Sequence, residues 1–279
     1  MYLIHNFTRF LLGPLTLLVI FAGCDNKKSK WVFDEQITLP EETRPLAIAE
    51  SDNHFLWVSD PQNYRILKIN RKGKIVDSIA NLKRPMNIDV HQEQLFIPEY
   101  HTDSIRRYAN GEKQPFQMNT KLQSPTGLHV HKDTIAVADF FNHRIVLQVN
   151  GKIRAIGKKG HKQGQLYYPI DVKIHNGKIY VADAYNHRVQ IFKNNGKFLR
   201  EIGTRDTLKV ASGIDVTQKL IAITDQEHDR VMLYNHEGKL LQSLQSNITY
   251  PTDVLLLNDS LFITNFTSHT LTVFVKKES

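Results

Sequence analysis

The chain has 279 residues, 41% of them hydrophobic and 23% charged, and its 36 Lys and Arg against 28 Asp and Glu give a formal net charge of +8. This composition is typical of a folded protein and excludes a disordered or collagen-like chain. The single Cys excludes an internal disulfide and a zinc site built from several cysteines.

Residues 1–23 are predicted to be a signal peptide. Arg9 precedes an apolar stretch that ends at Phe21. As a helix this stretch would span roughly 20 Å, which is too short for the ~30 Å hydrocarbon core of a bilayer. Ala22 and Gly23 then precede Cys24, and this sequence resembles a bacterial lipobox. We expect Cys24 to be acylated and to become the mature N-terminus; an ordinary signal peptide with a chance cysteine is the alternative.

Residues 24–30 are predicted to be a polar tether, which reaches at most ~20 Å when extended. The folded part would therefore stay close to its membrane. We expect a lipid-anchored protein of the bacterial cell envelope, on the periplasmic side or at the outer-membrane surface. Removal of the signal peptide takes away only one basic residue, Arg9, so the mature chain keeps a charge of +7.

Residues 31–279 are predicted to form one domain of six repeats. In each repeat a Pro or Ala opens an apolar alternating segment, and an acid or amide closes a second segment fourteen or fifteen residues later. The openers are Pro45, Pro85, Pro125, Pro169, Ala211 and Pro251, and the closing residues are Asp60, Glu99, Asp139, Asp183, Asp225 and Asn265. Two further short strands with a Gly turn complete most copies. Four strands every 40 to 44 residues predict an all-β, six-bladed β-propeller.

The fourth copy resembles a known repeat. Residues 180–192 and 195–198 closely resemble the NHL repeat, and residues 157–169 resemble the glycine loop between blades of that family. The chain from 31 to 277 is thus similar to an NHL-repeat propeller of the bacterial lipoprotein type. Two copies depart from the pattern, because Ser104 and Thr270 stand where the other copies carry Arg.

The sixth copy ends before its fourth strand. Residues 31–39 are β-rich, have no partner in a blade of their own and resemble the fourth strands of other copies. We expect this N-terminal strand to close the last blade, because the pairing removes an exposed sheet edge.

The loops that enter strand one and join strands two and three lie on one face of a propeller. Here that face is aromatic, rich in His and cationic, as binding hot spots are. The predicted ligand-binding residues are Tyr100, His101, Phe140, Phe141, His143, Tyr185, His187 and His228. The Asp and Arg at fixed repeat positions are expected to be structural. We predict a propeller that binds an envelope peptide, protein or glycan without turnover, as a monomer and with no cofactor.

Strand one offers candidate metal ligands. Asn87, Asp171 and Asp253 stand two residues after their openers and could hold Ca²⁺ or another cation on the axis, although channel water and backbone are alternative partners. His91, His131 and His175, six residues after their openers, have the chemistry of zinc ligands, but polar residues are also expected there for turn reasons. A metal-dependent lyase or hydrolase with an axial cation is therefore the alternative function.

The resemblance also points to enzymes of the family. Peptide-amidating lyases place zinc histidines directly after the opener, where this chain has Leu46, Met86, Thr126, Ile170, Ser212 and Thr252, none of which fits that role. Lactonase-like propellers use an axial Glu with Asn and Asp on calcium, and this chain has no Glu in that ring. Some NHL propellers bind RNA, which a charge of +7 would permit. Predicted export argues against a nucleic-acid partner.

Overall fold

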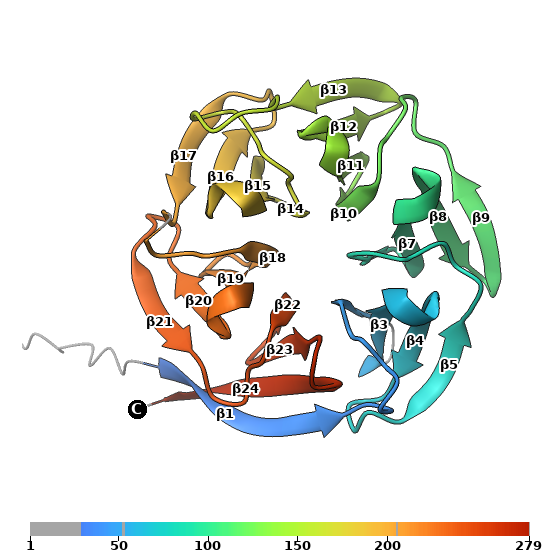
Figure 1. The fold of residues 1–279 in the computed structure, drawn as a ribbon, viewed down its shortest axis with the longest axis vertical. Helices are drawn as coiled ribbons and strands as arrows, with labels where there is room; N and C mark the ends of the chain where they lie inside the picture. Colours follow the sequence, from blue (N-terminus) through green and yellow to red (C-terminus); the bar gives the residue numbers. More distant parts are fainter. Residues whose placement is uncertain (1–28, 52–53, 205, 279) are drawn as a thin grey trace, which may run out of the picture.

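The computed structural model describes residues 29–51, 54–204 and 206–278. These residues form six four-stranded antiparallel sheets around a central axis (Figure 1). The prediction of an all-β, six-bladed propeller is confirmed. The predicted signal peptide and Cys24 lie outside the described residues.

The blades follow one another along the chain, each with its first strand innermost. The first blade consists of β2 (Ala47–Glu50), β3 (Leu56–Asp60), β4 (Arg65–Ile69) and β5 (Ile75–Ile79). The second consists of β6 (Asp89–His91), β7 (Gln94–Glu99), β8 (Ser104–Ala109) and β9 (Glu112–Phe116). The third consists of β10 (Pro125–His131), β11 (Thr134–Asp139), β12 (Arg144–Val149) and β13 (Lys152–Ile156).

The last three blades repeat this order. The fourth consists of β14 (Asp171–His175), β15 (Lys178–Asp183), β16 (Arg188–Lys193) and β17 (Phe198–Ile202). The fifth consists of β18 (Ala211–Val216), β19 (Ile221–Asp225), β20 (Arg230–Tyr234) and β21 (Leu240–Leu244). The sixth consists of β22 (Pro251–Leu257), β23 (Ser260–Asn265), β24 (Thr270–Glu278) and β1 (Ser29–Thr38).

Strand β1 closes the ring, as predicted. It pairs antiparallel with β24, with Ser29 opposite Glu278 and Thr38 opposite Thr270. The sixth blade therefore joins the two ends of the chain, and all strands of the propeller lie within residues 29–278.

The hydrophobic core lies between blades. The second strands are buried along their whole length in β3 and β19, because the blade packs against a neighbour on both faces. One core cluster joins Ile145 and Leu147 of the third blade to Val172 and Ile174 of the fourth. The fourth strands are mostly exposed, as in β5 and β13. Burial on both faces explains the apolar runs of the inner strands.

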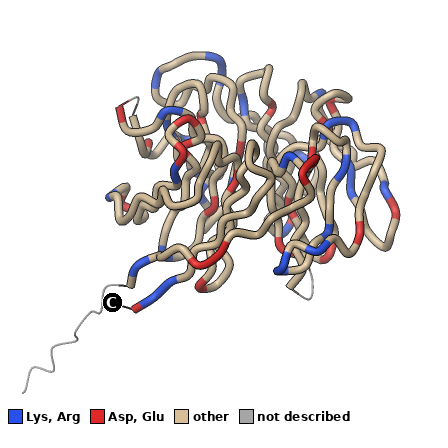
Figure 2. Tube along the Cα trace, turned by 60° about the horizontal axis from the view of Figure 1, so that its bottom comes forward, with Lys and Arg blue, Asp and Glu red and all other residues tan. Residues whose placement is uncertain are grey.

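The ring has two faces. The loop face carries the connections between strands two and three and between blades. The hairpin face carries the connections between strands one and two and between strands three and four. The start of β1 and the end of β24 lie at the hairpin face, because the backbone N–H of Lys276 donates to Asp259 in the β22–β23 hairpin at 2.9 Å. Figure 2 shows these two ends side by side at one edge of the molecule. Within the described ranges, no helix is long and apolar enough to cross a bilayer.

Candidate functional site

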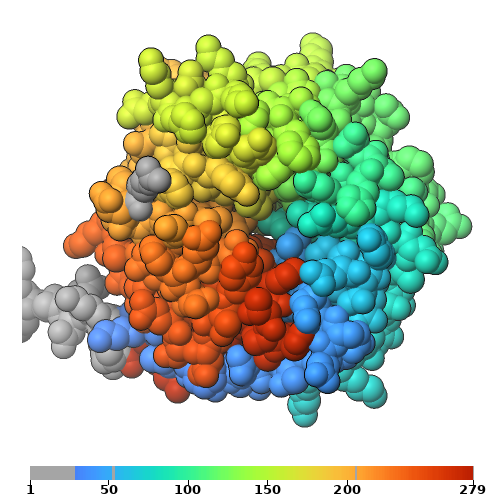
Figure 3. Space-filling model, in the orientation of Figure 1, coloured from blue at the N-terminus to red at the C-terminus, as the bar shows by residue number. Residues whose placement is uncertain are grey.

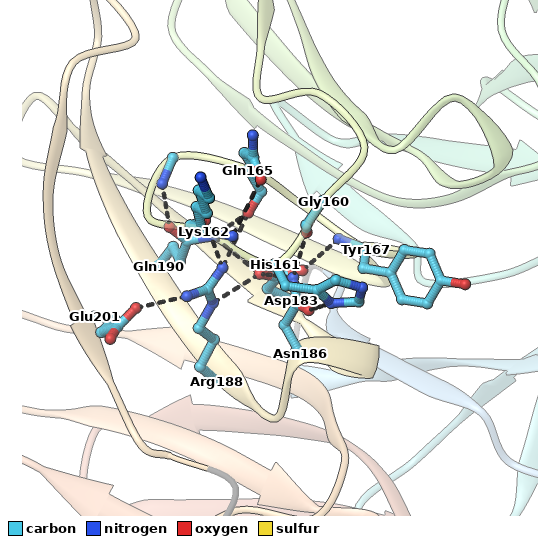
Figure 4. A network of polar contacts seen from close by, with 11 residues as sticks. Gly160, His161, Lys162, Gln165, Tyr167, Asp183, Asn186, Arg188, Gln190 and Glu201 are labelled. Atoms are coloured by element: carbon cyan, nitrogen blue, oxygen red, sulfur yellow. Dashed lines mark hydrogen bonds and ion pairs between the residues drawn. The ribbon is translucent and has the colours of Figure 1, made fainter.

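A buried acid at the end of strand two organises the loop face of each of the first five blades. In the fourth blade the Asp183 carboxylate accepts hydrogen bonds from Asn186 at 2.8 Å, from Arg188 at 2.9 Å and from the backbone N–H of Tyr167 at 2.7 Å (Figure 4). Burial raises the pKa of Asp183, and these hydrogen bonds oppose that rise. The carboxylate thus fixes both the turn that follows strand two and the loop that enters the blade.

Two blades vary this arrangement in a consistent way. Where Ser104 replaces the usual Arg, Arg106 donates to Glu99 from two residues further on, at 2.7 Å. In the sixth blade Thr270 stands in place of the Arg, and Asn265 stands in place of the acid. The side-chain amide of Asn265 donates to Thr270 and to Thr272. A buried charge is therefore either paired or absent at this position, as its desolvation cost requires.

The residues after the buried acid project their side chains at the loop face. They form a short 3-10 turn, such as Phe140–Asn142 or Ala184–Asn186, and the next residue has a left-handed backbone conformation. His143 and His187 take that position, with φ of 52° and 58°. Phe140, Phe141 and Tyr185 are carried by these turns.

Aromatic side chains of three neighbouring blades meet on this face. Ring centroids lie 6.2 Å apart for Tyr100 and Phe140, 4.8 Å for Phe140 and Tyr168, and 5.1 Å for Tyr168 and Tyr185. The aromatic cluster consists of Tyr100, Phe140, Phe141, Tyr167, Tyr168 and Tyr185. Tyr185 remains 56% exposed and Phe141 41% exposed, so the cluster is only partly covered.

A pocket of about 190 Å³ lies beside this cluster, at the mouth of the central channel. It is lined by Leu46, Arg84, Met86, Asn87, Tyr100, Thr126, Phe140, Ile170, Tyr185, Ser212, Gln226 and Thr252. Figure 3 shows a hollow on the axis, where the six blades meet. The guanidinium of Arg84 lies 4.9 Å from the ring centroid of Tyr100. Asn87 is only 4% exposed, and its side chain lies beside the buried carboxyl of Asp171, where it opposes the rise of the Asp171 pKa. We call this site the loop-face pocket.

The predicted ligand-binding residues divide into two groups. Tyr100, Phe140 and Tyr185 line the loop-face pocket, while Phe141 and His101 lie beside it, in contact with Tyr100.

The other three predicted residues are histidines, and a ring nitrogen of each one contacts another group of the protein. His143 is buried and accepts the backbone N–H of Tyr168 at 3.1 Å. His187 contacts the carbonyl of Lys209, and His228 bonds Asp225 at 2.8 Å. These histidines hold loops in place and do not line the pocket.

The three candidate metal ligands lie near one another at the axis, and the carboxyl oxygens of two of them, Asp171 and Asp253, already accept hydrogen bonds. Asp171 accepts the backbone N–H groups of Val172 at 2.8 Å and of Ile214 at 3.0 Å. Asp253 accepts those of Val254 at 2.8 Å and of Ile48 at 3.0 Å. Each carboxylate thus links its own blade to the next one.

A cation of the protein itself accompanies these carboxyls. Burial alone would lower the pKa of the Lys173 ammonium, but Asp171, Asp253, Asp89 and Asp215 together raise it above its ordinary value. Burial raises the pKa of Asp253 to about 8, while Lys173 acts in the opposite direction. Lys173 therefore remains charged and places a positive charge of the chain itself beside these carboxyls.

Lys173 lies in a second ring of the channel, four residues after the openers. A cavity of about 620 Å³ opens from this ring toward the hairpin face, and its lining includes Asp89, His129, Lys173 and Asp215. Burial lowers the pKa of His129 to about 3, so its ring is neutral and its Nδ1 accepts the backbone N–H of Ile174 at 3.2 Å. Asp89 and Asp215 accept backbone N–H groups of the following blades, those of Val130 and Leu256.

The histidines of the third ring do not form a zinc site. Within the described part of the chain, no three His, Cys, Asp or Glu side chains are arranged so that they could hold a metal ion. His175 instead stacks on His236 with ring centroids 5.9 Å apart, and His131 stacks on His129 at 6.4 Å. The expectation that His91, His131 and His175 act together on zinc therefore has no support in this geometry.

Several residues of the site were not among the sequence predictions. Tyr167 and Tyr168 come from the long loop that precedes Pro169, and two adjacent tyrosines just before an opener were the available signal. Arg84, Lys173 and Asp215 also lacked any motif. Their roles depend on which blades face each other across the ring.

Comparisons with known proteins agree with this fold. Residues 166–192 match the model of the NHL repeat family. A gluconolactonase from Xanthomonas campestris is 17% identical, with a TM-score of 0.72, over 87% of this chain and 89% of that one. A structure described as streptogramin B lyase is 13% identical, with a TM-score of 0.67, over 90% and 87%. A catalytically inactive virginiamycin B lyase from Staphylococcus aureus with quinupristin is 16% identical, with a TM-score of 0.64, over 88% and 84%. A search of curated proteins gave no match.

Proposed function

We propose that this protein is a lipid-anchored binding propeller of the bacterial envelope, which holds an aromatic or large aliphatic side chain of a peptide or protein partner in its loop-face pocket. The observation that carries the proposal is the pocket itself, where Tyr100, Phe140 and Tyr185 of three blades converge. Large rigid rings lose little entropy on contact and supply much apolar area.

The size and lining of the pocket support a single side chain as the inserted group. A volume of about 190 Å³ is below the range of sites that enclose a whole small molecule. Apolar walls and aromatic rings favour an apolar inserted group. The exposed rings of Phe141 and Tyr185 would contact neighbouring residues of the same partner.

The experiment is a selection of ligands by the purified domain, residues 25–279, from a displayed library of random peptides, with a glycan array in parallel. The proposal expects peptides enriched in aromatic or large aliphatic residues. Their binding should weaken in Tyr185→Ala and persist in Tyr250→Ala, because Tyr250 is a 39% exposed tyrosine of the same face outside the pocket. Retention on glycans alone would replace the peptide by a glycan. Peptide binding that is unchanged in Tyr185→Ala would contradict the assignment of the loop-face pocket as the binding site.

The alternative is a metal-dependent lyase or hydrolase, and the likeness of the fold to a gluconolactonase and to streptogramin lyases is what favours it. It would use Asn87, Asp171 and Asp253 around a cation. Lys173 and the backbone N–H groups already engage these carboxyls, which is why the geometry supports binding better. Elemental analysis separates the two functions: stoichiometric metal that is lost in Asp171→Ala would favour the enzyme.

A further inference from the structure

The described chain begins on the face opposite to the loop-face pocket. Strand β1 starts at Ser29 on the hairpin face and ends at Thr38, and the backbone N–H of Leu39 then donates to His269 on the loop face at 2.9 Å. A strand of 10 residues spans about 33 Å. The start of β1 and the loop face are therefore separated by about the depth of the disc (Figure 2).

The reach of the preceding segment sets the orientation. Cys24 precedes Ser29 by five residues in the sequence, and five residues span at most about 18 Å. This step rests on the lipid anchor of the proposed function. If the thiol of Cys24 carries the lipid, the bilayer lies within that distance of Ser29, which is less than the length of β1. The hairpin face is then held near the bilayer, and the loop face points away.

The hairpin face has the charge that an anionic bilayer attracts. Its exposed lysines are Lys30, Lys72, Lys74, Lys132, Lys152, Lys193, Lys197, Lys219, Lys239 and Lys277. Its carboxylates are slightly fewer and comprise Asp34, Glu35, Glu50, Glu93, Glu112, Asp133, Glu237, Asp259 and Glu278. Of these, Glu50 is paired with Arg71 at 3.4 Å. The face as a whole is cationic.

Three of its lysines gather at the place where the chain emerges. The register of β1 and β24 sets Lys30 opposite Lys277 and Trp31 opposite Lys276. Figure 2 shows blue segments, which mark Lys and Arg, beside the chain ends. Positive charge near the end of the tether acts where the bilayer is closest, and its effect falls off within about 8 Å at physiological salt.

We propose that the hairpin face is a docking surface for anionic phospholipid headgroups of the membrane that holds the anchor. Docking there leaves the loop-face pocket directed away from the bilayer and open to a partner. The loop face also carries exposed lysines, among them Lys83, Lys121 and Lys158, but the chain emerges from the other side. The two faces therefore supply matched sets of charge for a test.

The first test uses residues 25–279 without lipid, which contain every strand of the closed ring. We expect the domain to float with vesicles of phosphatidylcholine and phosphatidylglycerol, not with phosphatidylcholine alone, and to be released by salt. The variant Lys30→Glu/Lys276→Glu/Lys277→Glu should lose at least about tenfold in affinity, since each lysine near an anionic surface contributes. The control Lys83→Glu/Lys121→Glu/Lys158→Glu should bind nearly as the parent does. Equal losses in both variants, or no preference for anionic vesicles, would overturn the proposal.

The second test uses the full lipidated chain in the same vesicles. Cys24 is the single Cys of the sequence, so one introduced cysteine supplies the only free thiol once the lipid is attached. A fluorophore at Lys152→Cys, on the hairpin face, should be quenched by a quencher attached to lipid headgroups, and one at Lys121→Cys, on the loop face, should not. The reverse pattern would overturn the orientation.

These tests separate this proposal from the proposed function. Membrane association that resists high salt in the full-length parent and is lost in Cys24→Ser tests the anchor, and peptide binding by Tyr185→Ala tests the pocket. The vesicle assay with residues 25–279 depends on neither.

Discussion

The carboxyl group of Asp253 in the last blade accepts a hydrogen bond from the backbone N–H of Ile48 in the first blade, at 3.0 Å. This bond closes the ring next to the axis, while β1 and β24 close it at the outer edge. Asp171 makes the same kind of link to Ile214, from the fourth blade to the fifth. Buried carboxyls on the axis therefore join blades together, and this structural use explains why they recur at one position of strand one.

The outer closure predicts the effect of removing β1. Deletion of residues 30–39 takes away the partner of β24 and leaves its edge unpaired. We expect a lower melting temperature and aggregation on size-exclusion chromatography, because an exposed edge pairs with other chains. A chain that starts at residue 25 is the control and should be monomeric. A deletion that melts at the same temperature would contradict the role of β1.

The inner ring predicts that Gly213 tolerates no side chain. A Cβ at Gly213 would lie 2.7 Å from the Cα of Asp253 and 2.7 Å from the carbonyl oxygen of Thr252, both of them backbone atoms. Gly213→Ala should lower the free energy of unfolding by about 2 kcal/mol or more, measured by urea denaturation. Gly177→Ala is the control: its space is open and only its φ of +69° opposes a side chain, at about 1 kcal/mol. Equal losses would show that blade contact at the axis is loose.

The buried acid of the fourth blade predicts a rescue by a second substitution. Arg188→Thr leaves the Asp183 carboxylate without its ion pair, and we expect a loss of about 3 kcal/mol in the free energy of unfolding. Adding Asp183→Asn reproduces the uncharged pair Asn265 and Thr270 of the sixth blade and should recover part of that loss. If the double variant is less stable than Arg188→Thr alone, the charge of Asp183 is not the cause of the loss.

The axial cluster predicts a pH dependence of stability. Asp253 has a pKa of about 8 in the folded protein and 3.8 in the unfolded chain, so the folded state holds a proton that the unfolded state releases between these values. Its contribution to stability therefore falls as pH rises from about 4 to 8.

Lys173→Met should extend this decline, because the ammonium is what lowers the pKa of the neighbouring carboxyls. We expect the variant to be less stable than the wild type by about 3 kcal/mol at pH 9, and by less at pH 6, in urea unfolding. A difference that does not change with pH would show that the lost lysine matters only through packing.

The repeat spacing predicted the blades and the closing strand because a period is a local property of the chain. The departure of Ser104 and Thr270 from the pattern was also visible in the sequence, but the compensating bond from Arg106 to Glu99 appears only in the structure. Lys173 was not identified, because its position four residues after an opener resembles any polar residue of a wet channel. Only the ring brings it together with Asp89 and Asp215 from other blades.

At the loop face, too, the sequence identified only part of the arrangement. Phe140 and Tyr185 follow the buried acid and were found from the repeat. His143 stands at an equally regular position, but its left-handed backbone and its bond to Tyr168 turn it into a support for the loop. Residue type and spacing therefore predicted which face of the propeller carries the candidate binding residues. The side-chain contacts in the structure show which of these residues remain free to bind.

The most direct test of the central claim is the affinity of one library-selected peptide for three proteins: the parent domain, Phe140→Ala and Tyr250→Ala, measured by fluorescence anisotropy. Binding in the loop-face pocket predicts a loss of at least about 2 kcal/mol, roughly thirtyfold in Kd, for Phe140→Ala and less than about threefold for Tyr250→Ala. The same affinity for the parent and Phe140→Ala would contradict the assignment of this pocket as the binding site.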